Sequence, residues 1–342
     1  MSRMAVNVLV AVALLSCATK TTKESKEASA PLDPETQKKL AEMHDEVEVG
    51  RNMAGRLLQF YGTFDDEQVL GYVNQVGNFV AGYGDFPDRR YMFAILNSDQ
   101  VNAFACPGGY ILVTLGAIRN AQNEAEIAAV LGHEVAHVGK KHMFNTLKTM
   151  TPEEMDKTSK EAEKLKLPES VAVRKRPDPT SNSESGATLA RYLSGAAAGL
   201  SILQAAKAGM SLILEKGLGA ELEYEADREG VKYAVRAGYH PPALTDFLCR
   251  INHGMPGKEN LCAKTEKADK EKAAVASKDG NAASKDEKPK TILEKTHPPV
   301  TERVKSINHL LAEIKGADII GARGKVRFEK AIEALPAPVA KK

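Results

Sequence analysis

The sequence predicts an α+β fold that is mostly helical, with a small β-sheet beside one buried helix. Apolar residues recur at helical spacing through most of the chain, whereas only residues 91–96 and 101–113 have the composition and alternation of strands. Tryptophan is absent and aromatic residues make up 5% of the chain, so the core must be largely aliphatic. The length of 342 residues allows one large domain or two small ones. A formal net charge of +2 gives no case for a nucleic-acid partner.

The N-terminal segment is predicted to lie outside the fold. Residues 1–16 have the features of a signal peptide, because Arg3 precedes an apolar run that is too short to cross a bilayer. The Leu-Leu-Ser-Cys sequence ending at Cys17 is similar to a bacterial lipobox, which predicts a lipid anchor on Cys17; the alternative is an ordinary signal peptide with a chance cysteine. The next residue is alanine, not the aspartate typical of inner-membrane retention. We therefore expect a lipoprotein of the bacterial cell envelope, anchored in the outer membrane and facing the periplasm, with residues 17–34 as a flexible tether.

One folded domain is expected over residues 35–320, followed by a C-terminal segment, residues 321–342, with a disordered end. Asp66 and Glu67 are typical of a helix start, and the Pro-Gly-Gly sequence after Cys106 is typical of a turn. The elements expected in the first part of the domain are helices over about 34–60 and 65–80, a strand over 91–96, and two strands joined by that turn over 101–113.

The second part of the domain is expected to contain helices separated by polar insertions. Proline-containing residues 148–185 are predicted to form a mobile insertion that acts as a flap over the cleft, and lysine-rich residues 263–290 are predicted to form a disordered insertion. Residues 187–215 are rich in small and aliphatic side chains, but charges interrupt the run, so we expect a packed helical pair or a membrane-facing surface instead of a membrane span. The further helices expected run to about 236, from about 242, and over 304–314.

Residues 123–139 are predicted to form one buried helix that carries metal ligands. Asn123 is suited to cap its N-terminus, and glycine at 139 to close its C-terminus. His133 and His137 are four residues apart, so their imidazoles project from the same face and can bind one Zn²⁺ ion. Glu134 lies beside this pair, where it can accept a proton from water activated by the metal, as in the HExxH arrangement of metalloproteases.

The alternative for such a short motif is a solvated or capping histidine pair. The neighbouring helix positions are uncharged, as expected of a helix that is buried to hold ligands rigidly. A solvated face would carry lysine and glutamate there. These positions are Val130, Leu131, Val135, Ala136 and Val138. The flanking sequence therefore favours the metal site.

A catalytic zinc site normally has a third protein ligand, and the best candidate is Glu223. Glu223 and Asp227 are again four residues apart on a predicted helix, so both can face the metal. Asp227 is suited to accept the second N–H of a ligand histidine and fix its tautomer. Taken alone, the acidic run is typical of a charged helix surface. The spacing does not exclude Glu221 or Glu225 as the third ligand.

Four ordered motifs resemble those of the M48 (Ste24/HtpX-type) zinc metallopeptidases. In chain order, the first is the Asn-Ala-Phe-Ala-Cys-Pro-Gly-Gly sequence starting at residue 102, and the second is HExxH from His133 to His137. The third is ExxxD from Glu223 to Asp227, and the fourth is the His-Pro-Pro-Val-Thr-Glu-Arg sequence starting at His297. The resemblance spans residues 45–315. Cys106 departs from it, because an aliphatic residue is expected there.

The resemblance implies a zincin-type metallopeptidase domain, with a small sheet edge beside the HExxH helix and one zinc ion per chain. The residues it implies are His133, His137 and Glu223 as zinc ligands, Glu134 as general base, Asp227 as the partner of a ligand histidine, Asn102, Ala103 and Phe104 in the substrate cleft, His297 near the metal, and Arg303 as a support for that segment or for substrate. His297 is expected either to stabilise the developing oxyanion or to mask the fourth metal position in a resting state.

The expected activity is zinc-dependent endoproteolysis of unfolded or misassembled cell-envelope proteins. The alternative is a non-proteolytic zinc-binding envelope lipoprotein with a chaperone-like or structural role. Besides Cys17, three cysteines remain; Cys249 and Cys262 are able to close a local disulfide in an oxidising compartment, and buried free thiols are the alternative. The sequence predicts neither the oligomeric state nor the cleavage specificity.

Overall fold

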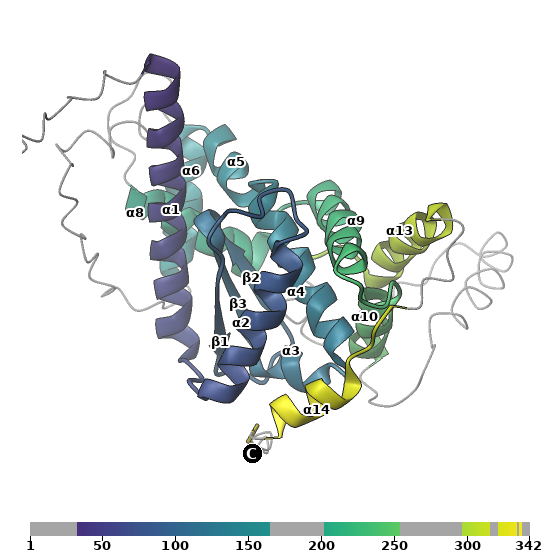
Figure 1. Ribbon diagram of the computed structural model, residues 1–342. Coiled ribbons are helices and arrows are strands. Elements are labelled where there is room, and N and C mark those ends of the chain that lie inside the picture. Colours follow the sequence, from purple (N-terminus) through teal and green to yellow (C-terminus); the bar gives the residue numbers. More distant parts are fainter. Residues whose placement is uncertain (1–32, 165–201, 254–295, 315–320, 334, 337–342) are drawn as a thin grey trace, which may run out of the picture.

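The computed structural model describes residues 33–164, 202–253, 296–314, 321–333 and 335–336, which form a mostly helical fold around one small sheet (Figure 1). In chain order the elements are α1 (Pro34–Tyr61), α2 (Glu67–Ala81), β1 (Met92–Leu96), β2 (Ala103–Cys106), a 3₁₀ turn (Pro107–Gly109), β3 (Tyr110–Thr114), α3 (Leu115–Asn120), α4 (Glu124–Gly139), α5 (His142–Thr149), α6 (Pro152–Lys164), α8 (Ile202–Ser211), a π-helical turn (Leu212–Lys216), α9 (Ala220–Arg236), α10 (Ala243–His253), α13 (Val300–Glu313) and α14 (Lys325–Ile332).

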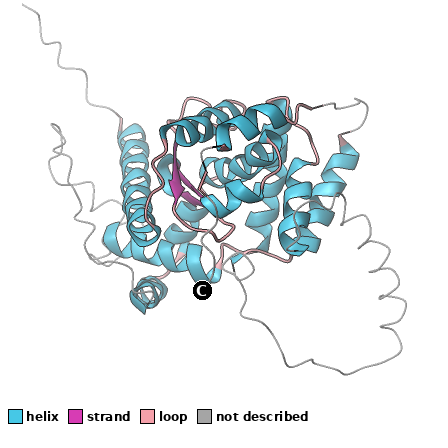
Figure 2. Ribbon diagram, turned by 90° about the horizontal axis from the view of Figure 1, so that it is seen from below, coloured by secondary structure: helices cyan, strands magenta, loops and turns pink. Residues whose placement is uncertain are grey.

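The sheet, magenta among the cyan helices in Figure 2, has three strands in the order β1-β3-β2. β1 pairs in parallel with β3, and β2 pairs with β3 in antiparallel register across the Pro-Gly-Gly turn. Side chains alternate between the two faces of a strand. Accordingly, Ile111 and Val113 of β3 face one apolar core with α2 and α4, whereas Leu112 faces a second core with α1 and α8. β2 is therefore an edge strand of this sheet, in contact with both α1 and α4.

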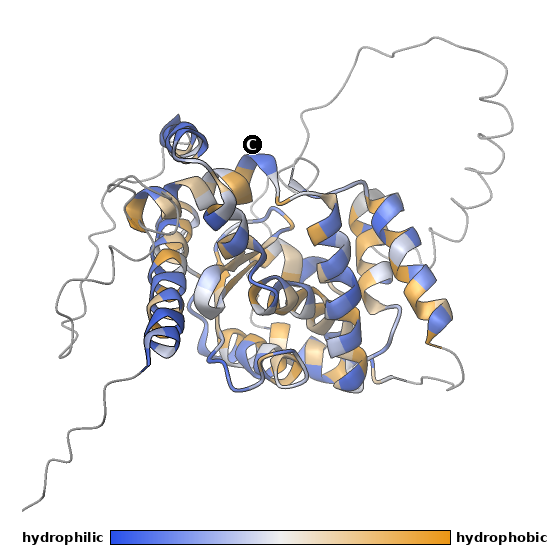
Figure 3. Cartoon of the chain, turned by 90° about the horizontal axis from the view of Figure 1, so that it is seen from above, coloured by the Kyte–Doolittle hydropathy of each residue, from blue (hydrophilic) through white to orange (hydrophobic). Residues whose placement is uncertain are grey.

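The two cores divide the helices into two groups. The larger core joins α2, α4, α9, α10, α13 and α14, and the smaller one joins α1, α5, α6 and α8 to the opposite face of the sheet. Hydrophilic and hydrophobic residues alternate around the outer helices (Figure 3), as expected of helices with one buried face. The mostly helical α+β class with a small sheet is confirmed.

The helices at the start of the domain form as predicted. α1 begins where the side chain of Asp33 accepts hydrogen bonds from the N–H groups of Glu35 and Thr36. α2 begins where Asp66 accepts from the N–H of Val69. The expected strands and the helices now labelled α4, α9, α10 and α13 are also present, although α13 begins four residues earlier than its apolar spacing indicated.

Part of the polar run over residues 148–185 is a packed helix. Residues 152–164 form α6, whose Met155 and Ala162 are buried in the smaller core against α8. The polar composition concealed this helix because only its narrow inner face is apolar. The rest of that run and residues 263–290 lie outside the described residues.

The C-terminal segment carries α14, which the sequence did not predict. Phe328 is buried in the larger core and Ala331 is also buried, and α14 packs against α2 and α4. The guanidinium of Arg327 donates hydrogen bonds to the carboxylate of Glu124 in the first turn of α4. α14 therefore supports the N-terminal end of the helix that carries the HExxH sequence.

The anchor region and one candidate disulfide partner lie outside the described residues, namely the signal peptide (1–16), Cys17, most of the tether and Cys262. Cys249 is disulfide-bonded, and Cys106 is free and fully buried in the smaller core. Among the described helices, none combines the length and apolar character that crossing a membrane requires.

Candidate metal centre

α4 is buried along its whole length, including its charged residues. Its N-terminus is capped by Asn123, whose side chain accepts from the N–H of Glu126, while the Glu126 carboxylate accepts from the N–H of Gln122. α4 ends at Gly139 as expected, but this glycine is itself helical and the left-handed conformation falls on Lys141. Burial on all sides holds the side chains of α4 in fixed positions.

α4 crosses α9 at a pair of glycines, and this contact sets the distance between the two predicted ligand sequences. A Cβ added to Gly230 would lie 2.5 Å from the backbone nitrogen of His133, and one added to Gly132 would lie 2.8 Å from the carbonyl oxygen of Gly230. No larger residue fits this approach. The close crossing brings Asp227 and Glu223, one and two turns before Gly230 on α9, to the imidazole of His133.

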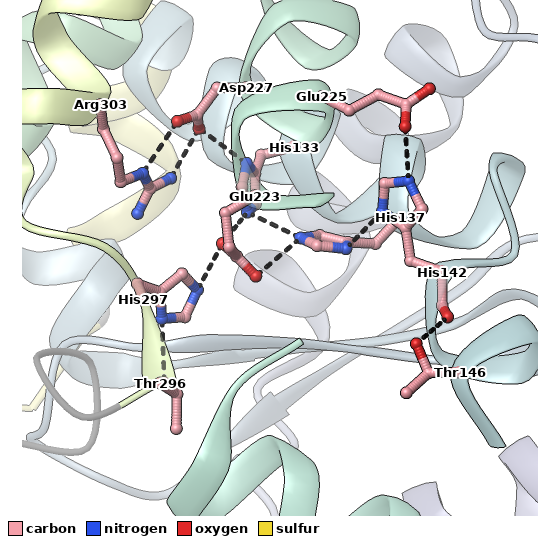
Figure 4. Close-up of polar contacts among 10 residues, drawn as sticks. All are labelled: His133, His137, His142, Thr146, Glu223, Glu225, Asp227, Thr296, His297 and Arg303. Atoms are coloured by element: carbon pink, nitrogen blue, oxygen red, sulfur yellow. Dashed lines mark hydrogen bonds and ion pairs between the residues drawn. The ribbon is translucent and has the colours of Figure 1, made fainter. Parts of the chain in front are cut away.

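Three imidazoles and one carboxylate converge between α4, α9 and the start of α13 (Figure 4). The Nε2 atoms of His133 and His137 are 3.1 Å apart. The Glu223 carboxylate lies 3.5 Å from Nε2 of His133 and 3.4 Å from Nε2 of His137. Nε2 of His297 lies 3.3 Å from Oε2 of Glu223, and candidate ligand atoms of His133, Glu223 and His297 all lie within 4.8 Å of one another.

The chemistry of this donor set fits a divalent cation. The buried Oε2 of Glu223 receives no hydrogen bond from any described residue. A cation bound to this oxygen would supply the missing partner. Burial alone would raise the pKa of Glu223, but His297, His137 and His133 outweigh it and hold this pKa well below its usual value. Burial alone would lower the pKa of His133, but Asp227 and Glu223 outweigh it and raise the pKa to about 10. The site therefore stabilises positive charge, and imidazole plus carboxylate is a zinc-type ligand set.

The ring nitrogen of His133 that does not face Glu223 contacts Asp227, and Asp227 is in turn held by Arg303. Nδ1 of His133 lies 2.9 Å from Oδ1 of Asp227. Arg303, on α13, donates to both oxygens of this carboxylate, at 2.9 Å from Nε and 2.6 Å from Nη2. Burial alone would raise the pKa of Asp227, but the Arg303 guanidinium outweighs it and keeps this pKa far below its usual value. Arg303 therefore contacts the residue that supports the metal site.

His137 is held from behind by a histidine that the sequence analysis missed. Nδ1 of His142 lies 2.9 Å from Nδ1 of His137, and Nε2 of His142 lies 3.3 Å from Oε2 of Glu225 (Figure 4). Burial, together with His137, lowers the pKa of His142 to about 4. The signal in the sequence was a third histidine five residues after His137, but its position follows from the bend at Lys141, which the sequence did not predict.

Glu134 lies where two hollows of the surface meet. One hollow is lined by apolar residues of α4 and α10 together with Asn102, and the other by residues of the π-helical turn together with Phe104. Ala103, Glu134 and His297 line both. Glu134 is 5% exposed, and burial raises its pKa although His133 and His137 act in the opposite direction.

The sequence profile of peptidase family M48 matches residues 67–311, which is more than half of the chain and covers α4, α9 and His297. The chain belongs to peptidase family M48. This M48 chain is 29% identical over 189 residues to the "Beta-barrel assembly-enhancing protease" of Yersinia pestis, covering 54% of this chain and 33% of that protein. It is 23% identical over 206 residues to the protein of the same name of Escherichia coli (strain K12), covering 60% and 37%. It is 25% identical over 187 residues to the "Putative beta-barrel assembly-enhancing protease" of Vibrio cholerae, covering 55% and 34%. The chain thus spans about a third of the length of these curated relatives.

In this M48 chain the two open alternatives for the third ligand lie away from the cluster. Glu221 is exposed, and Glu225 faces His142. Of the residues expected in the cleft, Asn102 and Ala103 line the first hollow and Ala103 and Phe104 line the second. Phe104 is itself mostly buried and stacks on Tyr61 of α1.

Proposed function

We propose that this M48 chain is a zinc-dependent endopeptidase that holds one Zn²⁺ ion per chain through His133, His137 and Glu223. The observation that carries the proposal is the convergence of these three buried side chains at one point, directly beside Glu134 and at the junction of two surface hollows. Buried polar groups without a ligand are costly, and a divalent cation compensates them.

In the proposed mechanism Glu134 moves the protons. When bound, zinc supplies Lewis-acid chemistry that polarises a peptide carbonyl and makes water more acidic. The Glu134 carboxylate accepts a proton from the attacking water and returns it to the leaving amine. Its burial favours this role, because a carboxylate with a raised pKa is a better base than one in water. Asp227 and Arg303 keep the His133 ring in place throughout.

Strand β2 is the proposed substrate platform. The N–H of Thr114 donates to the carbonyl of Asn102, and strand alternation then directs the carbonyl of Ala103 and both the N–H and the carbonyl of Ala105 away from β3. An extended substrate backbone is able to pair with this edge and cross the point between the hollows at Glu134.

The side chain of Asn102 adds a hydrogen-bond donor to this platform. Its Oδ1 accepts from the N–H of Ala103 at 2.9 Å, which fixes the amide orientation and leaves the buried Nδ2 without an acceptor among the described residues. We assign Nδ2 to a carbonyl of the bound substrate.

The proposed substrates are unfolded or misassembled proteins of the bacterial cell envelope. An edge strand recognises extended backbone, which folded proteins rarely expose. The names of the relatives from Yersinia pestis and Escherichia coli refer to assembly of β-barrels, which agrees with this class of substrate. The lipid anchor on Cys17 and the outer-membrane location facing the periplasm belong to the same proposal and rest on the N-terminal sequence alone.

His297 is proposed to mask the fourth metal position in a resting state. Its Nε2 lies 3.3 Å from Oε2 of Glu223, close enough to share a cation with that carboxylate. The hydroxyl oxygen of Thr296 lies 2.9 Å from Nδ1 of His297 and orients the ring. The same geometry is the observation that favours the second candidate function, a non-proteolytic zinc lipoprotein, because structural zinc sites are filled by protein ligands.

Casein degradation separates the two functions. The chain from Thr19 onward is expected to degrade casein, and a chelator is expected to stop it. Glu134→Gln should retain zinc and lose cleavage, because it removes the base without removing a ligand. His297→Ala should increase cleavage if this ring masks the metal. A wild-type chain and His297→Ala variant that both bind zinc but leave casein intact would favour the non-proteolytic function.

A further inference from the structure

The imidazole of His137 is the first of three side chains that lie in series and lead away from the candidate metal centre. His137, His142 and Glu225 come from α4, α5 and α9, and successive members lie 2.9 Å and 3.3 Å apart (Figure 4). His142 is 4% exposed, while the side chain of Glu225 is 38% exposed. The Lys140 ammonium lies 3.9 Å from the other Glu225 oxygen.

The positions of the ring hydrogens in this series of side chains follow from the role of His137 as a metal ligand. A cation is bound by a lone pair on Nε2 of His137, so the ring hydrogen must be on Nδ1. At 2.9 Å from it, Nδ1 of His142 must then be the acceptor. A neutral His142 carries its own hydrogen on Nε2, the atom that faces the Glu225 carboxylate. Each group thereby fixes the tautomer of the next.

We propose that His142 is a positioning residue for the metal ligand His137, and that Glu225 fixes the tautomer in which it acts. The proposal rests on the zinc site proposed above and extends it to a residue that touches neither metal nor substrate. His142 holds the His137 ring in the orientation and tautomer that direct Nε2 toward Glu223. Outer partners of this kind typically change metal affinity by about 10–100-fold when they are removed.

The arrangement differs from the support of the first ligand. His133 is backed by the buried Asp227, which Arg303 holds with two hydrogen bonds. His137 is backed by an imidazole ring instead, so this contact adds no further buried carboxylate to Glu134, Glu223 and Asp227. Glu225, at the solvent end, is the only charged member of this second support.

The test is the zinc affinity of the full chain, measured by competition with a chromophoric chelator. His142→Leu removes the acceptor at Nδ1, and we expect zinc binding about 10–100-fold weaker. His142→Asn keeps an acceptor near the Nδ1 position, and we expect affinity close to the wild type. His309→Leu is the control, since that side chain is 79% exposed on α13 and should have no effect.

A metal-free thermal unfolding curve for each variant separates positioning from folding. The proposal predicts that the leucine and asparagine variants differ in zinc affinity more than in metal-free stability. Wild-type affinity in His142→Leu would overturn it, and so would an equal loss in both variants, because a purely structural role predicts the latter. If His142→Leu does not fold, His142→Gln replaces it, because its amide reaches the Nε2 position and leaves the Nδ1 position empty. A wild-type chain without zinc affinity would instead refute the proposed function, and the positioning role with it.

Discussion

Replacing Gly230 with alanine perturbs the candidate metal centre without changing any side chain that lies in it. The new Cβ would lie 2.5 Å from the backbone nitrogen and 2.7 Å from Cα of His133, whereas ordinary contacts begin at 3.4 Å. The obstacle is helix backbone, which does not rotate away. α9 must therefore retreat from α4 by about 1 Å at the crossing, and Glu223 and Asp227 move with it.

The displacement is large compared with the tolerance of a metal site. Zinc–ligand distances are held within about 0.2 Å, so a shift of about 1 Å separates Glu223 from the two histidines. We expect zinc affinity to fall by at least about 100-fold, which exceeds the usual effect of an outer partner. Overpacking should also lower the free energy of unfolding of the metal-free chain by about 1–3 kcal/mol.

Gly71→Ala is the matched control. Gly71 lies on the exposed side of α2, and an added Cβ there meets nothing within 4 Å. Alanine is the better helix former, so this variant should be more stable by about 0.5–1 kcal/mol and bind zinc normally. Urea unfolding of the metal-free proteins and chelator competition measure the two effects. If Gly230→Ala binds zinc as tightly as Gly71→Ala, the close crossing does not position the ligands and the reasoning is refuted.

Three further predictions concern one ion pair at the site, one elsewhere in the fold, and the amide of Asn102. Arg303→Gln leaves the Asp227 carboxylate buried without its ion-pair partner, so urea unfolding of the metal-free chain should show a loss of about 3–5 kcal/mol; an unchanged midpoint would contradict the support assigned to this pair. Burial alone would raise the pKa of Glu46, but its ion pairs with Arg89 and Lys141 outweigh burial and lower this pKa. These pairs therefore stabilise the fold fully above the ordinary glutamate pKa, and this stabilisation is lost as the pH falls through the lower pKa that Glu46 has in the folded chain. Glu46→Gln should flatten the acid limb of a plot of unfolding free energy against pH, whereas Glu35→Gln, at an exposed site, should leave it unchanged. Asn102→Asp keeps the acceptor for the N–H of Ala103 but removes the Nδ2 donor, so kcat/KM on a peptide substrate should fall by about 3–10-fold. An unaltered kcat/KM would show that Nδ2 donates no hydrogen bond to the substrate.

The sequence predicted what depends on local spacing. The four-residue separation of His133 and His137 is enough to place both rings on one face of a helix, and the same holds for Glu223 and Asp227. Cap residues placed helix starts within a few residues, as at Asp66 and Asn123. These features are set by backbone geometry within one element, so they need no knowledge of the rest of the fold.

The parts that the sequence did not predict depend on contacts between elements. Nothing in the sequence distinguishes the two glycines at the crossing of α4 and α9 from other helical glycines, because their role depends on the contact between the two helices. The contact of His142 with His137 requires the left-handed turn at Lys141, a conformation that glycine or asparagine would normally mark. α6 was hidden because its polar residues outnumber its buried ones.

Zinc X-ray absorption spectroscopy of the purified chain tests the central claim most directly. The account predicts a first shell made only of nitrogen and oxygen at about 2.0–2.2 Å, with a histidine scattering pattern that weakens in His297→Ala and a shell that is lost when His133 and His137 are both replaced. A sulfur shell at about 2.3 Å, or zinc retained by the double variant, would place the ion elsewhere and contradict the account.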